Sequence, residues 1–585
     1  MRFSLKIVGE AGQGVLSIGG MLTKALKRSS MYTFGYRENP SLIKGGITTY
    51  QIDISDKPIY SLQSKTDILC SICNAGVKER FFEARKDAVV IHPLAQLHLT
   101  DEQQEYSVNN NLCVQTLDVP AFLRENNLLP IMGNVYLMGY VWRMLGLECV
   151  TMETVLTEWF EKKPTIAEQN IFCFQKGFES AQALDRIKCI TAFVGDESIA
   201  KHYLLDGTEA ISLGSIAAGV RAYFAYPMSP ASNILLHMSQ YGKKVGVVTK
   251  QAEDEITAAC MVIGANHMGT RSFTATSGGG FDLMTEAISM AAITETPFVC
   301  VLGQRPGPAT GLPTWTTQGD LLMSIYSAHG ESPKCVIALS DITSSYELMA
   351  EAFNIAERYQ MVVIVLADKY GLEAYQQVAS FPDITIERGN LITEQSLLDQ
   401  LQATDRYDVA SLSGVSKRWL PGAKAPTYDA NTDEHTGDGS TTEDACEAVQ
   451  SIDKRMRKLD ALAQEISDPT LYGNSQGDIL FVGWGSTKMV MMDILSLQDE
   501  FDQKISYLHY EYLWPLKVDT LKQHFSQFKK IVLVEGNKMG QLEILMKQAA
   551  DFPIHFDDRL LKYDGRPFFL DDILDYIHDN TTKSI

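Results

Sequence analysis

The feature that most constrains the fold is a set of short apolar runs, each followed by a polar or glycine-rich loop. The runs are nearly continuous in apolar residues, as in Phe298-Val-Cys-Val-Leu302 and Met361-Val-Val-Ile-Val-Leu-Ala367. Such runs are typical of parallel strands that are covered on both faces. Helical patterns separate them, so we predict a doubly wound parallel sheet. Its expected strands are residues 222–226, 244–249, 271–275, 297–302 and 361–367.

Comparable α/β patterns occur on both sides of this block. The first part of the chain opens with a strand, a glycine-rich turn and a helix, and the last part restarts in the same order. The elements expected there are strands at 5–8, 88–92, 111–116, 479–482 and 530–535 and a helix at 15–27.

The segment from about residue 388 to 473 has a different character. It contains a loop at 412–422, a stretch rich in Asp, Glu, Thr and Gly, and a charged helix that begins near Ile452. We expect an extended connection without a core of its own. At roughly 150 residues per domain, the chain should hold three or four domains. We predict boundaries that give segments 1–190, 191–387, 388–475 and 476–585.

Composition narrows the class of protein. The net charge of −21 disfavours binding to nucleic acid or to anionic membranes. The ten cysteines are scattered, which is typical of a reducing compartment. The chain starts directly in a strand-like run without a leader-like apolar region, and it has no apolar run of membrane-spanning length. We therefore expect a cytoplasmic enzyme or enzyme subunit.

Two short motifs in the first part stay ambiguous or structural. Gly9-Glu-Ala-Gly12-Gln-Gly14 follows a strand and opens a helix, where backbone amides suit a phosphate. Its glycines fall at positions 1, 4 and 6 instead of the dinucleotide spacing of 1, 3 and 6, so a tight turn is equally well supported. Lys44-Gly-Gly46 is another close-approach loop or a plain turn. Cys70 and Cys73 lie in a buried strand pattern, and we interpret them as structural cysteines.

Three polar loops follow successive strands of the middle block. They are Tyr226-Pro-Met-Ser-Pro-Ala-Ser232, Ser277-Gly-Gly-Gly-Phe281 and Gln304 to Thr314, of which the last carries a single cation. Ligands of open α/β sheets bind beyond the carboxyl ends of the strands. One such loop is an ordinary turn, but three in order predict a shared ligand site.

These motifs resemble those of the α subunits of 2-oxoacid:ferredoxin oxidoreductases, in the form that carries a fused N-terminal γ domain. The resemblance covers essentially the whole chain. It implies an α/β multidomain fold with a γ domain, a thiamine-diphosphate-binding (pyrimidine-type) doubly wound parallel sheet, a connector and a transketolase-C-like α/β domain. The matching segments are 9–16, 44–46, 205–210, 226–230, 277–281, 414–422, 433–435, 483–488 and 535–541.

The resemblance also indicates a cofactor glutamate. In related enzymes this residue lies about fourteen positions before a glycine that ends its helix, and counting back from Gly269 gives Glu255. Glu253 would then be a first-turn or capping acid. Glu255 should be buried, where its carboxyl group hydrogen-bonds the aminopyrimidine ring and promotes formation of the reactive carbanion.

The other site residues are assigned by the same resemblance. Arg305 would clamp the substrate carboxylate, helped by Ser229, which stands where relatives have threonine, and by Thr314. Trp315 departs from the basic residue that relatives often have after Leu-Pro-Thr, which weakens the case for a second carboxylate on the substrate. The cofactor-binding residues expected by resemblance are Tyr226, Pro227, Glu255 and Ser277.

The sequence carries only half of such an active site. It has no Gly-Asp-Gly motif with a following Asn-Asn, and no cysteine cluster suited to an iron–sulfur centre. The resemblance therefore implies a β subunit that holds the diphosphate, Mg²⁺ and a 4Fe–4S cluster. It implies ferredoxin as electron acceptor, CoA as co-substrate and an (αβ)₂ assembly.

Several functional readings follow. The first is oxidative decarboxylation of 2-oxoglutarate, followed by pyruvate or a branched-chain 2-oxoacid in the same family. A non-catalytic partner subunit and, with less support, a nucleotide-dependent dehydrogenase built on residues 9–14 are the alternatives.

Overall fold

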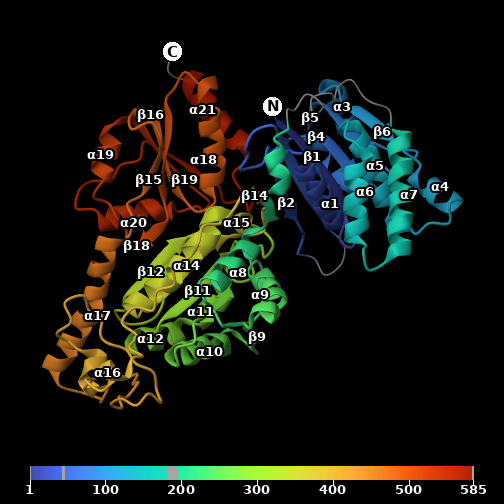
Figure 1. The fold of residues 1–585 in the computed structure, drawn as a ribbon. Coiled ribbons are helices and arrows are strands. Elements are labelled where there is room, and N and C mark those ends of the chain that lie inside the picture. The colour runs from blue at the N-terminus through green and yellow to red at the C-terminus, as the bar shows by residue number, and fades with distance from the viewer. Residues whose placement is uncertain (1, 42–45, 182–194, 583–585) are drawn as a thin grey trace.

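The computed structural model describes residues 2–41, 46–181 and 195–582, which form three main β-sheets with helices packed on them (Figure 1). Lys44 and Gly45 of the predicted close-approach loop lie outside the described residues. No helix within the described ranges is both long enough and apolar enough to cross a membrane.

The N-terminal sheet is mixed, with the order β2-β3-β1-β4-β5-β6. β3 runs antiparallel to both neighbours, whereas β1, β4, β5 and β6 are parallel. The strands are β1 (Arg2–Glu10), β2 (Tyr32–Glu38), β3 (Ile47–Ser55), β4 (Thr66–Ser71), β5 (Ala84–His92) and β6 (Cys113–Thr116). The helices are α1 (Val15–Arg28), α2 (Asn74–Arg80), α3 (Asp101–Asn109), α4 (Val119–Glu125), α5 (Gly133–Met144), α6 (Cys149–Trp159) and α7 (Pro164–Ser180).

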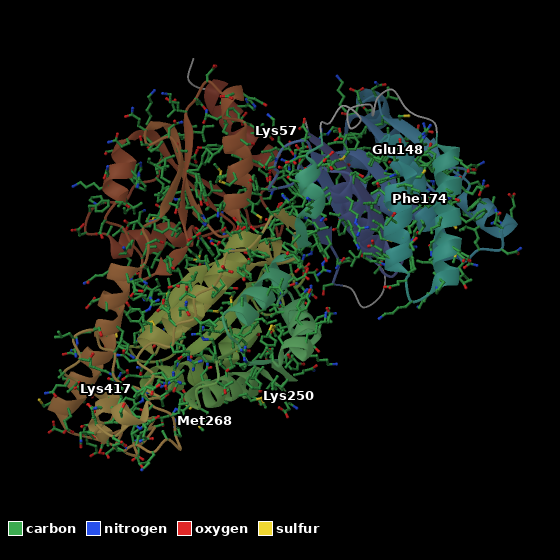
Figure 2. All side chains as sticks on the ribbon, viewed as in Figure 1. Lys57, Glu148, Phe174, Lys250, Met268 and Lys417 are labelled. Carbon is green, nitrogen blue, oxygen red and sulfur yellow. The ribbon has the colours of Figure 1, made fainter. Side chains whose placement is uncertain are left out.

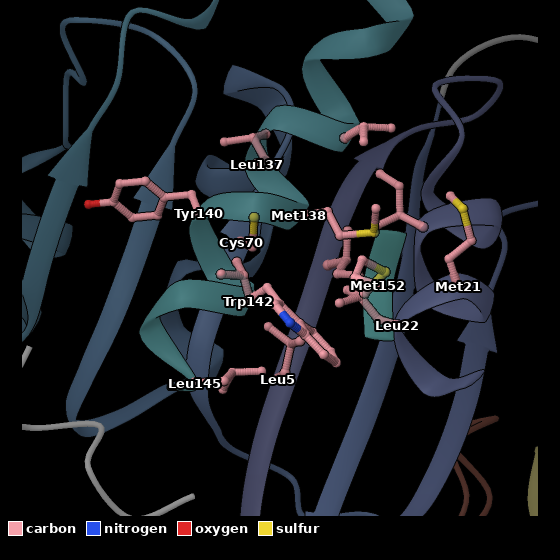
Figure 3. Packing of buried hydrophobic residues seen from close by; sticks show 14 of the residues in the cluster. Leu5, Met21, Leu22, Cys70, Leu137, Met138, Tyr140, Trp142, Leu145 and Met152 are labelled. Carbon is pink, nitrogen blue, oxygen red and sulfur yellow. The ribbon is translucent and has the colours of Figure 1, made fainter. Parts of the chain in front are cut away.

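The core of this part lies between the sheet and helices α1, α5, α6 and α7. Figure 3 shows Trp142 and Met138 of α5 beside Leu5 of β1, with Cys70 in the same cluster. The thiol of Cys73 accepts a hydrogen bond from the amide of Gly76 at 3.3 Å and so caps α2. In the C-x-x-C motif, Cys70 therefore packs in the core and Cys73 caps a helix.

The middle sheet has the order β18-β12-β13-β11-β10-β8-β9, and every strand except the edge strand β18 is parallel to its neighbours. The strands are β8 (Ala222–Ala225), β9 (Val248–Gln251), β10 (Ser272–Thr276), β11 (Phe298–Gln304), β12 (Lys334–Ala338), β13 (Val362–Asp368) and β18 (Tyr512–Trp514). The helices are α8 (Gly207–Ala217), α9 (Ser232–Val245), α10 (Glu255–His267), α11 (Gly278–Leu283), α12 (Thr285–Ile293), α13 (Leu321–Tyr326), α14 (Ile342–Tyr359) and α15 (Lys369–Glu373).

Both faces of this sheet are buried, as the apolar runs predict. Cys300 and Leu302 of β11 pack towards α10–α13, whereas Val299 and Val301 pack towards α8, α9 and α14, because successive side chains of a strand point to opposite faces. The predicted doubly wound parallel sheet is confirmed. One strand is displaced: β9 begins at Val248, because Lys244 and Val245 still belong to α9, which ends at Gly246 with φ 74°.

The C-terminal sheet has the order β15-β17-β16-β19-β20. Its strands are β15 (Thr470–Gly473), β16 (Gly477–Trp484), β17 (Ile505–Tyr510), β19 (Phe528–Glu535) and β20 (Asp558–Leu561). Its helices are α18 (Thr487–Ser496), α19 (Leu521–Ser526), α20 (Gln541–Ala549) and α21 (Leu570–Thr582). β18 leaves this part of the chain to pair with β12, so the last two sheets share one hydrophobic cluster.

The segment before the C-terminal sheet holds few regular elements among its described residues, namely α16 (Gln395–Leu398), a short 3-10 helix (Ala403–Tyr407) and α17 (Ala445–Glu465). The expectation that it lacks a core was wrong. Trp419 is buried against Leu398 and Leu401 in a small cluster, with Tyr428 packed beside it. The exact domain limits at residues 190, 387 and 475 stay a prediction.

Candidate active site

The three polar loops lie side by side at the carboxyl edge of the middle sheet, because β8, β10 and β11 are neighbouring parallel strands. They also contact one another. The guanidinium of Arg305 donates a hydrogen bond to the carbonyl of Ser229 at 2.9 Å. A Cβ atom at Gly303 would lie 3.2 Å from Pro230, and Thr276 Oγ1 lies 4.0 Å from the sulfur of Met228.

Glu255 is the first residue of α10, the helix that lies between the labelled Lys250 and Met268 in Figure 2. Asp254 is the N-cap residue, since its carboxylate accepts a hydrogen bond from the amide of Thr257 at 2.7 Å. The capping role expected for Glu253 was therefore wrong: Glu253 precedes the cap and is exposed. This start of the helix directs Glu255 inward, where its exposure is 3%.

The Glu255 carboxyl group lies against the glycine run that opens α11. A Cβ atom at Gly280 would fall 2.5 Å from Oε1 of Glu255 and 2.1 Å from Oγ1 of Thr276, so only glycine fits there without a shift. Within the described ranges, Oε1 is buried and has no hydrogen-bond partner. An unpaired buried polar atom costs about 1–3 kcal/mol, which favours a ligand as the missing partner.

Several other buried polar atoms around the strand ends also lack a partner in the described part of the chain. They are Ser277 Oγ after β10, Gln304 Nε2 at the end of β11, Thr314 Oγ1 and Asp320 Oδ2. Three of them lie close together, since the Asp320 amide donates to Gln304 and a Cβ atom at Gly278, next to Ser277, would lie 3.6 Å from Asp320 Oδ2. Such a group of unpaired polar atoms is what a polar ligand site requires. Sequence reasoning selected Ser277 and Thr314 but missed Gln304 and Asp320. Gln304 could have been found as the last residue of β11, whereas nothing local distinguishes Asp320.

Asp320 and Arg305 form the charged part of the cluster. Burial, reinforced by the charge of Asp282, raises the pKa of Asp320 to about 7, although Arg305 opposes the shift. Burial also lowers the pKa of Arg305 below its usual range, while Asp320 acts in the opposite direction. The backbone amide of Asp320 donates to Gln304 Oε1 at 3.1 Å, which links the start of α13 to the end of β11.

The remaining predicted site residues lie at the rim. Tyr226, Pro227 and Ser229 are exposed, and Thr314 is half-buried. The loop beyond Thr314 is held by the C-terminal part of the chain, since the amide of Thr316 donates to the carbonyl of Gly565 at 3.1 Å.

A cation lies beside the side chain of Trp315. The guanidinium carbon of Arg566 lies 3.3 Å from the centre of its indole ring. Arg566 also approaches Glu38 of β2 at 3.9 Å. The sequence gives no signal for this neighbour, because 251 positions separate it from Trp315.

In the first block, Gly12 and Gly14 of the glycine-rich turn have φ values of 89° and 83°, which other residues rarely adopt. Gly14 is the N-cap residue of α1, and the amide of Ala11 donates to the carbonyl of Gly46 at 3.1 Å. The turn is thus tight and close to the neighbouring loop. This geometry is compatible with both interpretations, a phosphate-binding loop and a plain turn.

Two family models match the chain. Residues 213–453 match "Pyruvate flavodoxin/ferredoxin oxidoreductase, thiamine diP-bdg", and residues 4–180 match "Pyruvate ferredoxin/flavodoxin oxidoreductase". Among curated proteins, the 2-oxoacid:ferredoxin oxidoreductase subunit alpha of a Sulfolobus species is 28% identical over 98% of this chain and 96% of its own length. The 2-oxoglutarate synthase subunit KorA of Archaeoglobus fulgidus is 31% identical over 57% of this chain and 88% of its own length.

Among solved structures, the 2-oxoglutarate:ferredoxin oxidoreductase of Magnetococcus marinus superposes with a TM-score of 0.89. The sequence identity is 25%, and the match covers 99% of each chain.

Proposed function

Because the chain belongs to the family of 2-oxoacid:ferredoxin oxidoreductase α subunits, we propose that it takes part in the thiamine-diphosphate-dependent oxidative decarboxylation of a 2-oxoacid. A 2-oxoacid, CoA and oxidised ferredoxin would give an acyl-CoA, CO₂ and reduced ferredoxin. 2-Oxoglutarate is the first choice, and pyruvate or a branched-chain 2-oxoacid is the alternative. The observation that carries the proposal is the buried Glu255 carboxyl group, whose Oε1 has no hydrogen-bond partner among residues 2–41, 46–181 and 195–582.

The residues of the cluster fit the aminopyrimidine half of thiamine diphosphate. Among the described residues, Glu255 Oε1 is a buried atom without a hydrogen-bond partner, and an O–H of this carboxyl group would donate to a ring nitrogen, which accepts. Gly280 leaves space beside it that any larger residue would fill. Ser277 supplies a second unpaired atom from the neighbouring loop, and Tyr226 and Pro227 would line the rim.

When bound, thiamine diphosphate supplies the carbanion and the electron sink that decarboxylation requires. The task of Glu255 is to hold a hydrogen bond to the ring nitrogen from a buried carboxyl group. Asp254 fixes the start of α10 and thereby the direction of Glu255, while Gly280 and Thr276 limit where its carboxyl group can lie.

The substrate carboxylate would be bound by Arg305, with the hydroxyl groups of Ser229 and Thr314 as further donors. Arg305 is half-buried and already fixed to the carbonyl of Ser229. Thr314 Oγ1 is buried and has no hydrogen-bond partner in the part of the chain that the structure describes, which supports a role in binding. Asp320, with its pKa raised to about 7, is a further group that could hold a proton near the substrate.

The choice of 2-oxoglutarate is supported by Arg566. A substrate with a second carboxylate needs a second cation, and Trp315 cannot supply one. Arg566 lies on the ring of Trp315 and so brings a guanidinium to this loop from another part of the chain.

We further propose that a β subunit completes the site by holding the diphosphate, Mg²⁺ and a 4Fe–4S cluster. The name "subunit alpha" carried by the Sulfolobus relative supports a multi-subunit assembly. Ferredoxin is the proposed electron acceptor, and (αβ)₂ is the proposed stoichiometry.

The test uses the complex co-purified from the native host, with Glu255→Gln as the variant. We expect 2-oxoglutarate-dependent reduction of ferredoxin by the parent complex and a loss of at least about a hundredfold in the variant. Glu253→Gln is the matched control, because Glu253 is exposed two positions earlier. Unchanged turnover of the Glu255 variant would favour a non-catalytic subunit.

A further inference from the structure

A cavity of about 480 Å³ lies where α1 of the N-terminal block meets residues 200–204 and Tyr375. Figure 1 shows α1 and β14 (Gln376–Val378) at this junction of the blocks. We propose that this cavity binds a nucleoside phosphate. None of the three active-site loops lines the cavity. The inference goes beyond the proposed function if the ligand is a free nucleotide, and it rests on the proposed function if the ligand is CoA.

The charge of the lining is the first argument. Lys24, Lys27, Arg28 and Arg37 line the cavity, and no described lining residue is acidic, although the whole chain has a net charge of −21. A helix C-terminus favours cations in its last turn, which accounts for Lys27 and Arg28 of α1, whereas Arg37 of β2 pairs with Glu373 at 3.0 Å. The cavity is therefore an electropositive site on an acidic protein, which attracts anions.

The ion pairs leave part of this charge uncompensated. Glu158 pairs with both Lys24 and Arg28, at 2.9 and 2.7 Å, and Glu373 pairs with Arg37 at 3.0 Å, so two carboxylates face four cations. The ammonium of Lys27 donates to the backbone carbonyls of Ala200 and His202, and no described carboxylate lies within ion-pairing distance of it. Burial and the neighbouring charges of Arg28 and Lys24 lower the pKa of Lys27. A phosphate would offset the repulsion between these cations and accept a hydrogen bond from the remaining N–H of Lys27.

The aromatic lining is the second argument. Trp159 and Tyr203 line the cavity and are 45% and 57% exposed, which is high for residues of their kind. The indole lies across α1 at Gly20, where a Cβ atom would approach it to 3.4 Å. Exposed rings beside cations are surfaces on which nucleobases stack.

The combination selects the ligand class. Lys27, together with Lys24 and Arg28, which share one carboxylate, matches a diphosphate better than a single carboxylate, and the exposed rings favour an aromatic group on the same molecule. The volume is within the range of small-molecule sites. Free ADP and the phosphorylated adenosine end of CoA share this chemistry, and the experiment separates the two sources.

The test is a calorimetric titration of the purified complex with ADP, adenosine and CoA. We expect saturable ADP binding and much weaker binding of adenosine. Displacement of ADP by CoA would assign the site to CoA, and unaffected ADP binding in the presence of CoA would assign it to a free nucleotide. Absence of saturable ADP binding would overturn the proposal.

Variants locate the binding. We expect ADP binding to weaken about tenfold in Lys27→Gln and also in Trp159→Ala, which removes a partly exposed ring. Lys176→Gln is the matched control, because Lys176 of α7 pairs with Glu179 on the surface of the same block. Glu255→Gln should leave ADP affinity unchanged, so failure of the proposed catalytic function and failure of this site give different results. Parental ADP affinity in both cavity variants would place the nucleotide elsewhere and reject the cavity.

Discussion

Gly280 lies so close to Glu255 that a Cβ atom at position 280 would fall 2.5 Å from the carboxyl oxygen Oε1. The two residues belong to different helices, α11 and α10, and meet at the carboxyl end of β10. The glycine therefore determines how near the two helices can come. It also determines where the carboxyl group lies, because closely packed neighbours cannot yield freely.

Gly280→Ala should displace the carboxyl group of Glu255 and reduce kcat/KM for the 2-oxoacid by at least about tenfold, since misplacement by about 1 Å can cost that much or more. Steady-state turnover of the co-purified complex measures the effect. Gly279→Ala is the control, because a Cβ atom at position 279 meets nothing within 4 Å. An equal loss of kcat/KM in both variants would show that activity depends on the start of α11 and not on the contact with Glu255.

Asp320→Asn should stabilise the protein more at pH 8 than at pH 5. Burial raises the pKa of Asp320 from 3.8 to about 7. Between these values the folded protein holds a proton that the unfolded chain releases, so this carboxyl group lowers the free energy of unfolding as pH rises towards 7. The variant removes this cost, which is on the order of 4 kcal/mol above pH 7, because the pKa differs by about 3 units at about 1.36 kcal/mol per unit. The measurement is the difference in thermal unfolding midpoint between the variant and the parent protein at pH 5 and at pH 8. An equal difference at both pH values would contradict the prediction.

The local part of the site could be predicted from the sequence. The resemblance to related enzymes indicates Glu255, through its spacing from Gly269, and Ser277, through the glycine run that follows its strand. Both signals lie within one strand–loop–helix unit, where sequence pattern and backbone geometry are directly coupled. Their functional roles remain proposals.

The contacts between distant segments could not be predicted in this way. Asp320 becomes unusual only through burial near Arg305 and Asp282, and Arg566 becomes a neighbour of Trp315 only when the C-terminal part packs on the loop. Trp419 likewise belongs to a segment whose composition suggested an exposed connection. A single sequence holds no periodic signal for such pairings, which depend on tertiary packing.

Glu295→Gln should release the segment that contains Trp419. The Glu295 carboxylate is buried, pairs with Lys454, and lies 2.5 Å from the ammonium of Lys458. Removing its charge leaves two buried cations, which typically costs about 3–5 kcal/mol. Hydrogen exchange over residues 403–444 should therefore accelerate.

The control for this effect is Lys417→Gln, at the position labelled in Figure 2. Lys417 is about half exposed and pairs with Asp405 at 3.3 Å, so its loss should cost no more than about 1 kcal/mol. Unaltered exchange in the Glu295 variant would indicate that apolar packing around Trp419, and not the ion cluster, holds the segment.

Arg566→Ala should raise the KM for 2-oxoglutarate about tenfold and leave the KM for pyruvate nearly unchanged. The reason is that a guanidinium on Trp315 can bind the second carboxylate of 2-oxoglutarate, a contact that pyruvate cannot make, and a charge-assisted hydrogen bond contributes about 1.5–3 kcal/mol. Initial rates of ferredoxin reduction with each substrate give both constants. Arg559→Ala is the matched control, since Arg559 lies in the same part of the chain and pairs instead with Glu543. If both substrates lose affinity equally, Arg566 acts by holding the Trp315 loop in place; if neither does, the second carboxylate is bound elsewhere and the preference for 2-oxoglutarate loses its support in this chain.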